Sequence, residues 1–151
     1  MTTSPTQTHV TSTTMIAAVG TVADHSGIPA KIPELLDQVW AHIRGTGLEG
    51  HGHNVVMYRN QGAELTAGVQ VPDDTPEPPA PLILTTTPSG AAVHVQHVGP
   101  SSGIPEKVMA LFGYCNEHKL TPVEPSWEVY GDWEEDESKL VTDIYLSIAA
   151  D

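Results

Sequence analysis

The chain has 151 residues, of which 39% are hydrophobic, and a formal net charge of −13 with only six lysine and arginine residues. This length suffices for one globular domain, and so few basic residues exclude the positive surface that nucleic-acid binding requires. No apolar run approaches the roughly 18 residues of a membrane-spanning helix. The single cysteine, Cys115, excludes an intramolecular disulfide and predicts a reducing, cytoplasmic setting.

The first half of the chain predicts a strand, a helix and a hairpin. Residues 1–13 are rich in Thr and Ser and lack the basic and apolar regions of a secretory signal, so we expect a disordered tail. Strands are predicted at 15–23, 53–59 and 63–71. Between the first two, apolar residues at spacings of three and four predict a helix with one buried stripe: Ile32, Leu35, Leu36, Val39 and Ile43.

The second half repeats this order after the proline-rich acidic connector 73–81. Strands are predicted at 82–87, 91–98, 127–130 and 140–149, and the acidic residues 134–137 are expected to form a solvated turn. A helix between the second and third of these strands has its own apolar stripe: Val108, Leu111, Phe112 and Cys115.

One tetrapeptide marks the repetition. Ser-Gly-Ile-Pro occurs at 26–29 and again at 102–105, an offset of 76 residues (102 − 26), each time between a predicted strand and a predicted helix. Tyr58 and Tyr130 close equivalent strands at an offset of 72 (130 − 58). A matched word within a matched order of elements indicates a duplicated βαββ unit.

The duplication predicts the fold class and the domain limits. We expect an α+β domain in which two βαββ units form one antiparallel sheet, with both helices on one face and a ligand cleft between the halves. Residues 14–151 would be a single domain, with repeat one at 14–72 and repeat two at 82–149. The sheet face opposite the helices would meet solvent or a partner, or form a concave ligand groove.

The segment 126–133, with the sequence Ser-Trp-Glu-Val-Tyr-Gly-Asp-Trp, holds the main candidate site. In a strand, side chains alternate between faces, so Glu128 and Tyr130 share one face, and Trp127 is expected on the other, packed under the helices. A carboxylate beside a phenol, with indoles nearby, suits a flat, apolar or cationic molecule. A solvated glutamate on an ordinary strand edge is the plainer alternative.

The pseudo-repeat, this aromatic segment, the turn His97-Val98-Gly99-Pro100 and the closing segment 139–146 together resemble the GyrI-like small-molecule-binding domains. These domains are similar to the effector-binding domains of AraC- and MerR-type transcription regulators. The resemblance covers residues 15–149. The chain has Ser101 where the family usually has an aromatic residue, and we expect a stand-alone form because no helix-turn-helix segment precedes the domain.

The resemblance implies an aromatic cleft with a glutamate at its base, which maps onto Glu128 with Tyr130 as its motif partner. Further candidate ligand-binding residues are Tyr58 as the repeat counterpart of Tyr130, Val56 as the counterpart of Glu128, Tyr145 in the last strand, and Trp133 as a rim or lid. Members bind bulky, planar, often cationic drug-like molecules. Some are implicated in opening the cyclopropane rings of DNA-alkylating compounds by hydrolysis with that glutamate.

Several other site types lack support in the sequence. His51, His53, His94 and His97 have no cysteine or carboxylate at zinc-ligand spacing, so no metal site is predicted, and His97 is expected to orient the following turn. Nucleophile-elbow and phosphate-binding glycine motifs are absent from the sequence, and no cofactor is expected.

Three functional hypotheses remain open. The first is a binding protein, monomeric or homodimeric, that senses or sequesters planar aromatic, including cationic, compounds. The second is a hydrolase that opens strained rings, with Glu128 and Tyr130 as catalytic residues. The third is an inhibitor of the gyrase-inhibitor type that binds a protein partner. In each case neither nucleic acid nor membrane is expected to bind directly.

Overall fold

The computed structural model describes residues 4–149, and the chain divides into two compact units. The first unit is Ser12–Pro88, and the second joins Met1–Thr11 to Ser89–Asp151. Each unit has one long helix and four antiparallel strands, so the predicted α+β class and the duplicated βαββ order are confirmed. No helix within residues 4–149 is long and apolar enough to cross a membrane.

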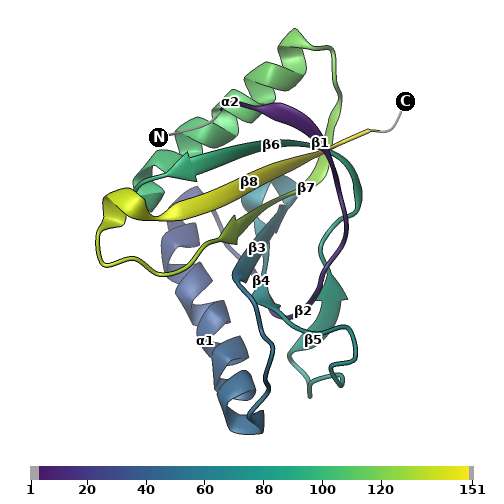
Figure 1. The fold of residues 1–151 in the computed structure, drawn as a ribbon, viewed down its shortest axis with the longest axis vertical. Helices are drawn as coiled ribbons and strands as arrows, with labels where there is room; N and C mark the ends of the chain where they lie inside the picture. Colours follow the sequence, from purple (N-terminus) through teal and green to yellow (C-terminus); the bar gives the residue numbers. More distant parts are fainter. Residues whose placement is uncertain (1–3, 150–151) are drawn as a thin grey trace. The chain divides into compact units, whose positions relative to one another are not determined.

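The first unit contains the expected strand, helix and hairpin (Figure 1). Helix α1 (Ile28–Thr46) lies against β2 (Thr14–Thr21) and β4 (Glu64–Gln70). It buries Leu35, Val39 and Ile43. It ends at Gly47, whose left-handed φ of 67° is a conformation that glycine adopts without steric cost. The strand order in this unit is β3-β4-β2-β5. Its elements are β2 (Thr14–Thr21), α1 (Ile28–Thr46), β3 (Asn54–Arg59), β4 (Glu64–Gln70) and β5 (Ile83–Thr86).

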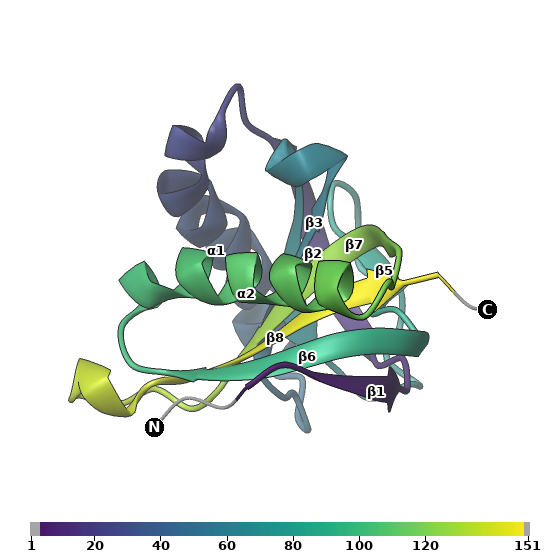
Figure 2. The same ribbon diagram turned by 90° about the horizontal axis from the view of Figure 1, so that it is seen from above.

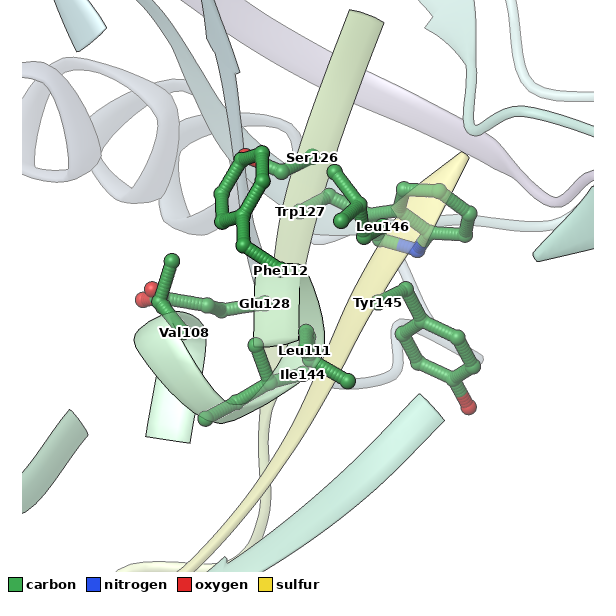
Figure 3. A pocket seen from close by; sticks show the side chains of 9 residues that line it. All are labelled: Val108, Leu111, Phe112, Ser126, Trp127, Glu128, Ile144, Tyr145 and Leu146. Carbon is green, nitrogen blue, oxygen red and sulfur yellow. The ribbon is translucent and has the colours of Figure 1, made fainter. Parts of the chain in front are cut away.

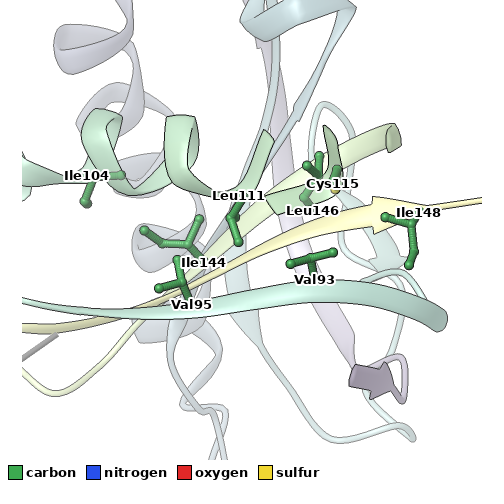
Figure 4. Packing of buried hydrophobic residues seen from close by; sticks show 8 residues of the cluster. All are labelled: Val93, Val95, Ile104, Leu111, Cys115, Ile144, Leu146 and Ile148. Carbon is green, nitrogen blue, oxygen red and sulfur yellow. The ribbon is translucent and has the colours of Figure 1, made fainter. Parts of the chain in front are cut away.

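The second unit repeats this arrangement, with strand order β1-β6-β8-β7. Figure 2 shows α2 (Ile104–Glu117) lying along β6 (Gly90–Val98) and β8 (Val141–Ile148). Figure 4 shows the apolar side chains that pack between the helix and these strands. Leu111 and Cys115 of α2 are each 1% exposed in this core. The elements are β1 (Thr6–Val10), β6 (Gly90–Val98), α2 (Ile104–Glu117), β7 (Pro122–Tyr130) and β8 (Val141–Ile148).

The repeated Ser-Gly-Ile-Pro word forms the same local structure in both units. Each copy joins a short 3-10 helix, His25–Gly27 or Ser101–Gly103, to a long helix that has proline in its first turn. Proline is tolerated there because the first helical N–H groups have no intrahelical acceptor. At Gly103 a Cβ would lie 2.6 Å from His97 Cε1, so this close approach of helix and strand requires glycine.

Two short strands differ from the prediction. The tail 1–13 was expected to be disordered, but Thr6–Val10 forms β1 and pairs with β6; residues 1–3 lie outside the described residues. Strand β5, predicted within repeat two, pairs with β2 of the first unit. The short strand that precedes each βαββ unit in the chain thus pairs with a strand of the other unit. Short edge strands of Thr-rich sequence have little apolar alternation, so their pairing leaves no pattern in the sequence.

Strand β7 is longer than predicted. It begins at Pro122 instead of residue 127, and its pairing with β8 shifts register between Pro122 and Ser126. Proline lacks the N–H that a regular ladder needs, and it is accommodated at such irregularities. The two prolines at 122 and 125 therefore concealed the first part of this strand.

Candidate functional site

Glu128 is placed by β7 on the helix-covered face of the second unit. It pairs with Ile144 of β8, which in turn pairs with Val95 of β6. Directly opposed residues of antiparallel strands project to the same face, and Ile144 and Val95 both belong to the core beneath α2. Glu128 accordingly lies beneath α2, and it is only 6% exposed.

Tyr130 lies on the same face two residues further along β7. Its hydroxyl donates a hydrogen bond of 2.6 Å to Glu128 Oε1, and its ring packs against the α2 core. A hydrogen bond to a carboxylate is stronger than one between neutral groups, so it restricts the orientation of the acid. The predicted pairing of these two side chains on one face is thus present in the structure.

A small pocket opens beside this carboxylate. The space is about 210 Å³, counted together with the part open to solvent. Figure 3 shows α2 side chains on one side of it and β7 and β8 on the other, with Glu128 projecting toward the helix. The lining residues are Val108, Leu111, Phe112, Ser126, Trp127, Glu128, Ile144, Tyr145 and Leu146.

This pocket is not the ligand groove considered on the uncovered sheet face, and that groove stays a prediction. A ligand groove was considered on the sheet face that the helices leave uncovered, whereas this pocket lies between α2 and the strands of its own unit. The strand register explains this position of the pocket. Glu128 pairs with Ile144, a core residue, so the Glu128 side chain points to the helix-covered face. A one-residue shift in register would have placed it on the other face.

Trp127 and Tyr145 occupy the opposite face of the second unit. Trp127 was expected beneath the helices, but its ring stacks on Tyr145 with centroids 4.8 Å apart, and His94 contacts Tyr145 at 4.7 Å. The three residues are register partners on β7, β8 and β6. Figure 3 shows the rings of Trp127 and Tyr145 on the opposite side of the strands from the Glu128 carboxylate. Tyr145 therefore borders the same pocket as Glu128, but its ring lies on the other face of the strands from the Glu128 carboxylate.

Trp127, Tyr145 and His94 form an aromatic ladder across the strands, and its surroundings change the pKa of the Tyr145 phenol. His94 Nε2 lies 2.8 Å from Asp143 Oδ1, within ion-pair distance when the histidine is protonated. Burial raises the pKa of the Tyr145 phenol, and the nearby negative charge of Asp143 raises it further. Both effects disfavour the phenolate. Tyr145 is thus a neutral side chain in the ladder at physiological pH.

The remaining predicted site residues are dispersed. Val56 and Tyr58 lie on β3 of the first unit; Val56 is fully buried, and Tyr58 is partly buried. Their register partners are Ala67 and Leu65, and Leu65 in turn opposes Gly20, which is in close contact with α1. Both candidates therefore face α1, as Glu128 and Tyr130 face α2. Trp133 lies in the loop after β7 and is 82% exposed.

The sequence did not predict that residues of α2 would line the pocket. Phe112 was assigned to the buried stripe of the helix, but it is 45% exposed and lines the pocket together with Val108. The helical spacing of three and four residues identifies the stripe but not its edge. Phe112 lies at that edge, and its sequence pattern carries no signal that separates it from the buried members of the stripe.

The histidines do not gather into a site. His94 and His97 point to opposite faces of β6, as predicted, and His97 Nε2 donates a 2.8 Å hydrogen bond to the Pro100 carbonyl, which confirms its role in the turn. Within residues 4–149, no three His, Cys, Asp or Glu side chains are grouped so as to hold a metal ion.

Comparison with known proteins identifies the family and the fold. A family model described as the GyrI-like small molecule binding domain matches residues 21–149. The EcmrR C-terminal domain is similar at a TM-score of 0.78 and 15% identity, with 96% of each chain covered. SAV2435 bound to tetraphenylphosphonium is similar at 0.68 and 14%, with 97% of this chain and 94% of that chain covered.

A hydrolase from Listeria innocua has the same fold at a TM-score of 0.64 and 14% identity, with 97% of this chain and 92% of that chain covered. A comparison with curated protein sequences found no match. At these identities the likeness of the solved structures shows the fold, while the family model shows the membership.

Proposed function

Because the chain belongs to the GyrI-like small molecule binding domain family, we propose that the pocket beside Glu128 binds planar aromatic compounds, cationic ones included. The protein would sense or sequester these compounds. The observation that carries the proposal is a carboxylate only 6% exposed at the edge of an otherwise mostly apolar lining. Apolar walls remove water from a ligand, and the fixed carboxylate orients its positive charge.

The electrostatics of this arrangement favour a cation. A charge pair separated from water interacts more strongly than the same pair in solvent, because the effective dielectric constant is lower. The hydrogen bond from Tyr130 already orients the carboxylate before a ligand enters. The net charge of −13 adds a long-range attraction that raises the local concentration of cations. SAV2435, whose structure is bound to tetraphenylphosphonium, an aromatic cation, supports the same chemistry.

The test is a charge substitution in the pocket. Glu128→Gln retains the size and shape of the side chain and removes its charge. We expect it to weaken binding of a cationic aromatic compound at least about tenfold, while a neutral compound of the same shape changes less than about threefold. Isothermal titration calorimetry on the full chain measures both affinities.

Exposed acids provide the matched control, because they contribute to net charge without lining the pocket. Glu135→Gln removes one charge from the exposed loop after β7, and we expect it to leave both affinities within about twofold. Equal losses for the cationic and neutral compounds in Glu128→Gln would contradict the charge argument.

The paired carboxyl and phenol also favour a second candidate, a ring-opening hydrolase. Glu128 would accept a proton from water as the water oxygen forms a bond to a strained ring carbon. The ring bond to that carbon breaks, its electron pair passes to the electrophilic end of the substrate, and the Tyr130 hydroxyl protonates that end. The 2.6 Å contact between the two side chains would then let the proton return to Tyr130 from Glu128.

This alternative is decided by product formation. Incubation of the purified protein with an activated cyclopropane should yield the water adduct, and Glu128→Ala should abolish it. Tight binding with no product above the uncatalysed rate would exclude the hydrolase and leave the binding function.

The cellular setting is part of the proposal. We infer a cytoplasmic protein, monomeric or homodimeric, that acts without direct contact to nucleic acid. Burial raises the pKa of the Cys115 thiol and keeps it unreactive, which suits a free cysteine in a reducing compartment. The gyrase-inhibitor type of protein partner stays a prediction, and the salt dependence of any complex would test it.

A further inference from the structure

The solvent side of helix α2 differs in charge from the rest of this acidic chain. Leu111 and Cys115 pack into the core, so the other side of the helix faces solvent. Met109 is 71% exposed there, and Phe112 is 45% exposed. No residue from 108 to 116 is charged. The outward face of α2 consists of the exposed residues Met109, Ala110, Phe112, Gly113 and Asn116.

The first repeat shows that the scaffold does not impose an uncharged face. The two helices align at the offset of 76 residues at which the Ser-Gly-Ile-Pro words coincide. At this offset the exposed acids Glu34 and Asp37 of α1 correspond to Ala110 (110 − 34) and Gly113 (113 − 37) of α2. The second helix thus lacks both carboxylates that the first presents to solvent. Exposed apolar side chains without charge are typical of the centre of a protein interface.

The charge balance favours a second copy of this chain as the partner. Residues 104–119 contain two carboxylates, Glu106 and Glu117, and two lysines, Lys107 and Lys119, so their net charge is zero, whereas the whole chain has −13. A basic partner would be attracted by carboxylates, and their lack at this face would weaken its binding. A second copy is itself strongly acidic, so a neutral face is where it meets the least repulsion.

The two ends of the helix also complement each other in an antiparallel pair. Glu106 is exposed in the first turn, and Lys119 is exposed just beyond the last turn. A two-fold axis near Gly113 places Glu106 of one copy opposite Lys119 of the other, because Gly113 lies about midway between them. An added Cβ at Gly113 would meet no atom within 4 Å, so the position is open to a neighbouring side chain. Met109 is a large exposed side chain that can fill it, which gives the self-complementary surface of a two-fold contact.

We propose that the outward face of α2 is a homodimer interface, in which two copies pack their α2 helices antiparallel about a two-fold axis near Gly113. This contact goes beyond the proposed function, which leaves monomer and homodimer open, and it requires no ligand. Two short helices bury less surface than the roughly 1,200 Å² at which standard interfaces begin, so we expect a weak dimer with a dissociation constant on the order of 100 µM.

Sedimentation equilibrium on the full chain measures the dimer. Between about 5 µM and about 1 mM protein, we expect the average mass to rise from the 16.1 kDa of the monomer toward twice that mass. An increase in salt from about 0.05 M to about 0.5 M should tighten the dimer at least about threefold, because salt screens the repulsion between two acidic chains. A mass of 16.1 kDa at every concentration overturns the proposal and leaves the face to another kind of partner.

Ala110→Glu tests the charge of the face, because it introduces the acid of the first repeat. We expect it to weaken the dimer at least about tenfold, while Ala110→Gln, which has the same shape without the charge, stays within about threefold. Gln38→Glu adds the same charge to the exposed side of α1 and should stay within about twofold. Circular dichroism checks that each variant folds. A dimer unchanged in Ala110→Glu would lie on another surface and overturns the proposal.

Gly113→Cys tests the position of the axis without a change of charge, and it also serves if Ala110→Glu fails to fold. Oxidised glutathione should join the two copies at residue 113 by a disulfide, and the glutathione is reduced to its thiol as the two cysteine thiols are oxidised. Asp37→Cys, at the equivalent position of α1, is the matched control and should stay monomeric on a non-reducing gel. Cys115 is buried and does not compete. Equal cross-linking of the two variants, or none in either, contradicts the antiparallel contact.

Discussion

The two units have the same elements but differ at the positions that matter for binding. Helices α1 and α2 each bury a leucine at equivalent positions, Leu35 at 3% and Leu111 at 1% exposed. On the strands, the second unit has Glu128 where the first has Val56. The comparison shows that a duplicated scaffold can keep its helical core while one copy acquires a charge. Three predictions test how far the equivalence extends.

The largest effect is expected from moving the charge to the first unit. Val56 is fully buried on the α1-facing side of β3, so Val56→Glu places a carboxyl in an apolar core. We expect a loss of about 3–5 kcal/mol in the free energy of unfolding, because an uncompensated buried charge loses its hydration. Urea denaturation at neutral pH measures it.

Glu128→Val is the reciprocal variant. Replacement of a buried carboxylate by an apolar side chain is often neutral or stabilising, so we expect no loss beyond about 1 kcal/mol. If Val56→Glu costs less than about 1 kcal/mol, the first unit already tolerates a carboxylate, and the contrast between the two sites disappears.

The next effect compares the two cores. Leu35→Ala and Leu111→Ala each remove a buried side chain beneath a helix, and each should lower the free energy of unfolding by about 2–5 kcal/mol. Thermal unfolding followed by circular dichroism gives the order. We expect the two losses to agree within about 1 kcal/mol, and a larger gap would show that the two helices contribute unequally to stability.

The smallest effect concerns a residue of the second unit alone. Burial and Asp143 hold the pKa of Tyr145 above the ordinary tyrosine value of about 10. Because the folded-state pKa is raised, the associated stability is fully present below pH 10 and is lost as pH rises through the folded pKa. We expect Tyr145 to ionise after an unperturbed tyrosine, measured as the difference in tyrosinate absorption between wild type and Tyr145→Phe.

Asp143→Asn is the control for that titration. It removes the second cause of the shift while the ring stack with Trp127 remains, so the pKa of Tyr145 should fall but stay above the ordinary value. A Tyr145 that ionises at the ordinary tyrosine value of about 10 would show that the stacked rings do not shield its hydroxyl.

Prediction from sequence succeeded where the signal is local and periodic. The apolar stripes located both helices, and the alternation along β7 placed Glu128 and Tyr130 on one face. It failed where the signal depends on a distant partner. Strand β1 has no apolar alternation of its own, and its partners on β6 lie 80 (90 − 10) to 88 (94 − 6) residues away in the chain.

The candidate site shows the same division. Residue types and spacing in the sequence determined that an acid and a phenol lie together, because a two-residue period fixes relative direction on a strand. Which face they occupy depended on the register with Ile144 of β8, and that register placed the acid beneath α2 and Tyr145 on the other side. The tertiary structure alone brought Phe112 to the mouth of the pocket, because burial at the edge of a helical stripe is decided by what packs against it.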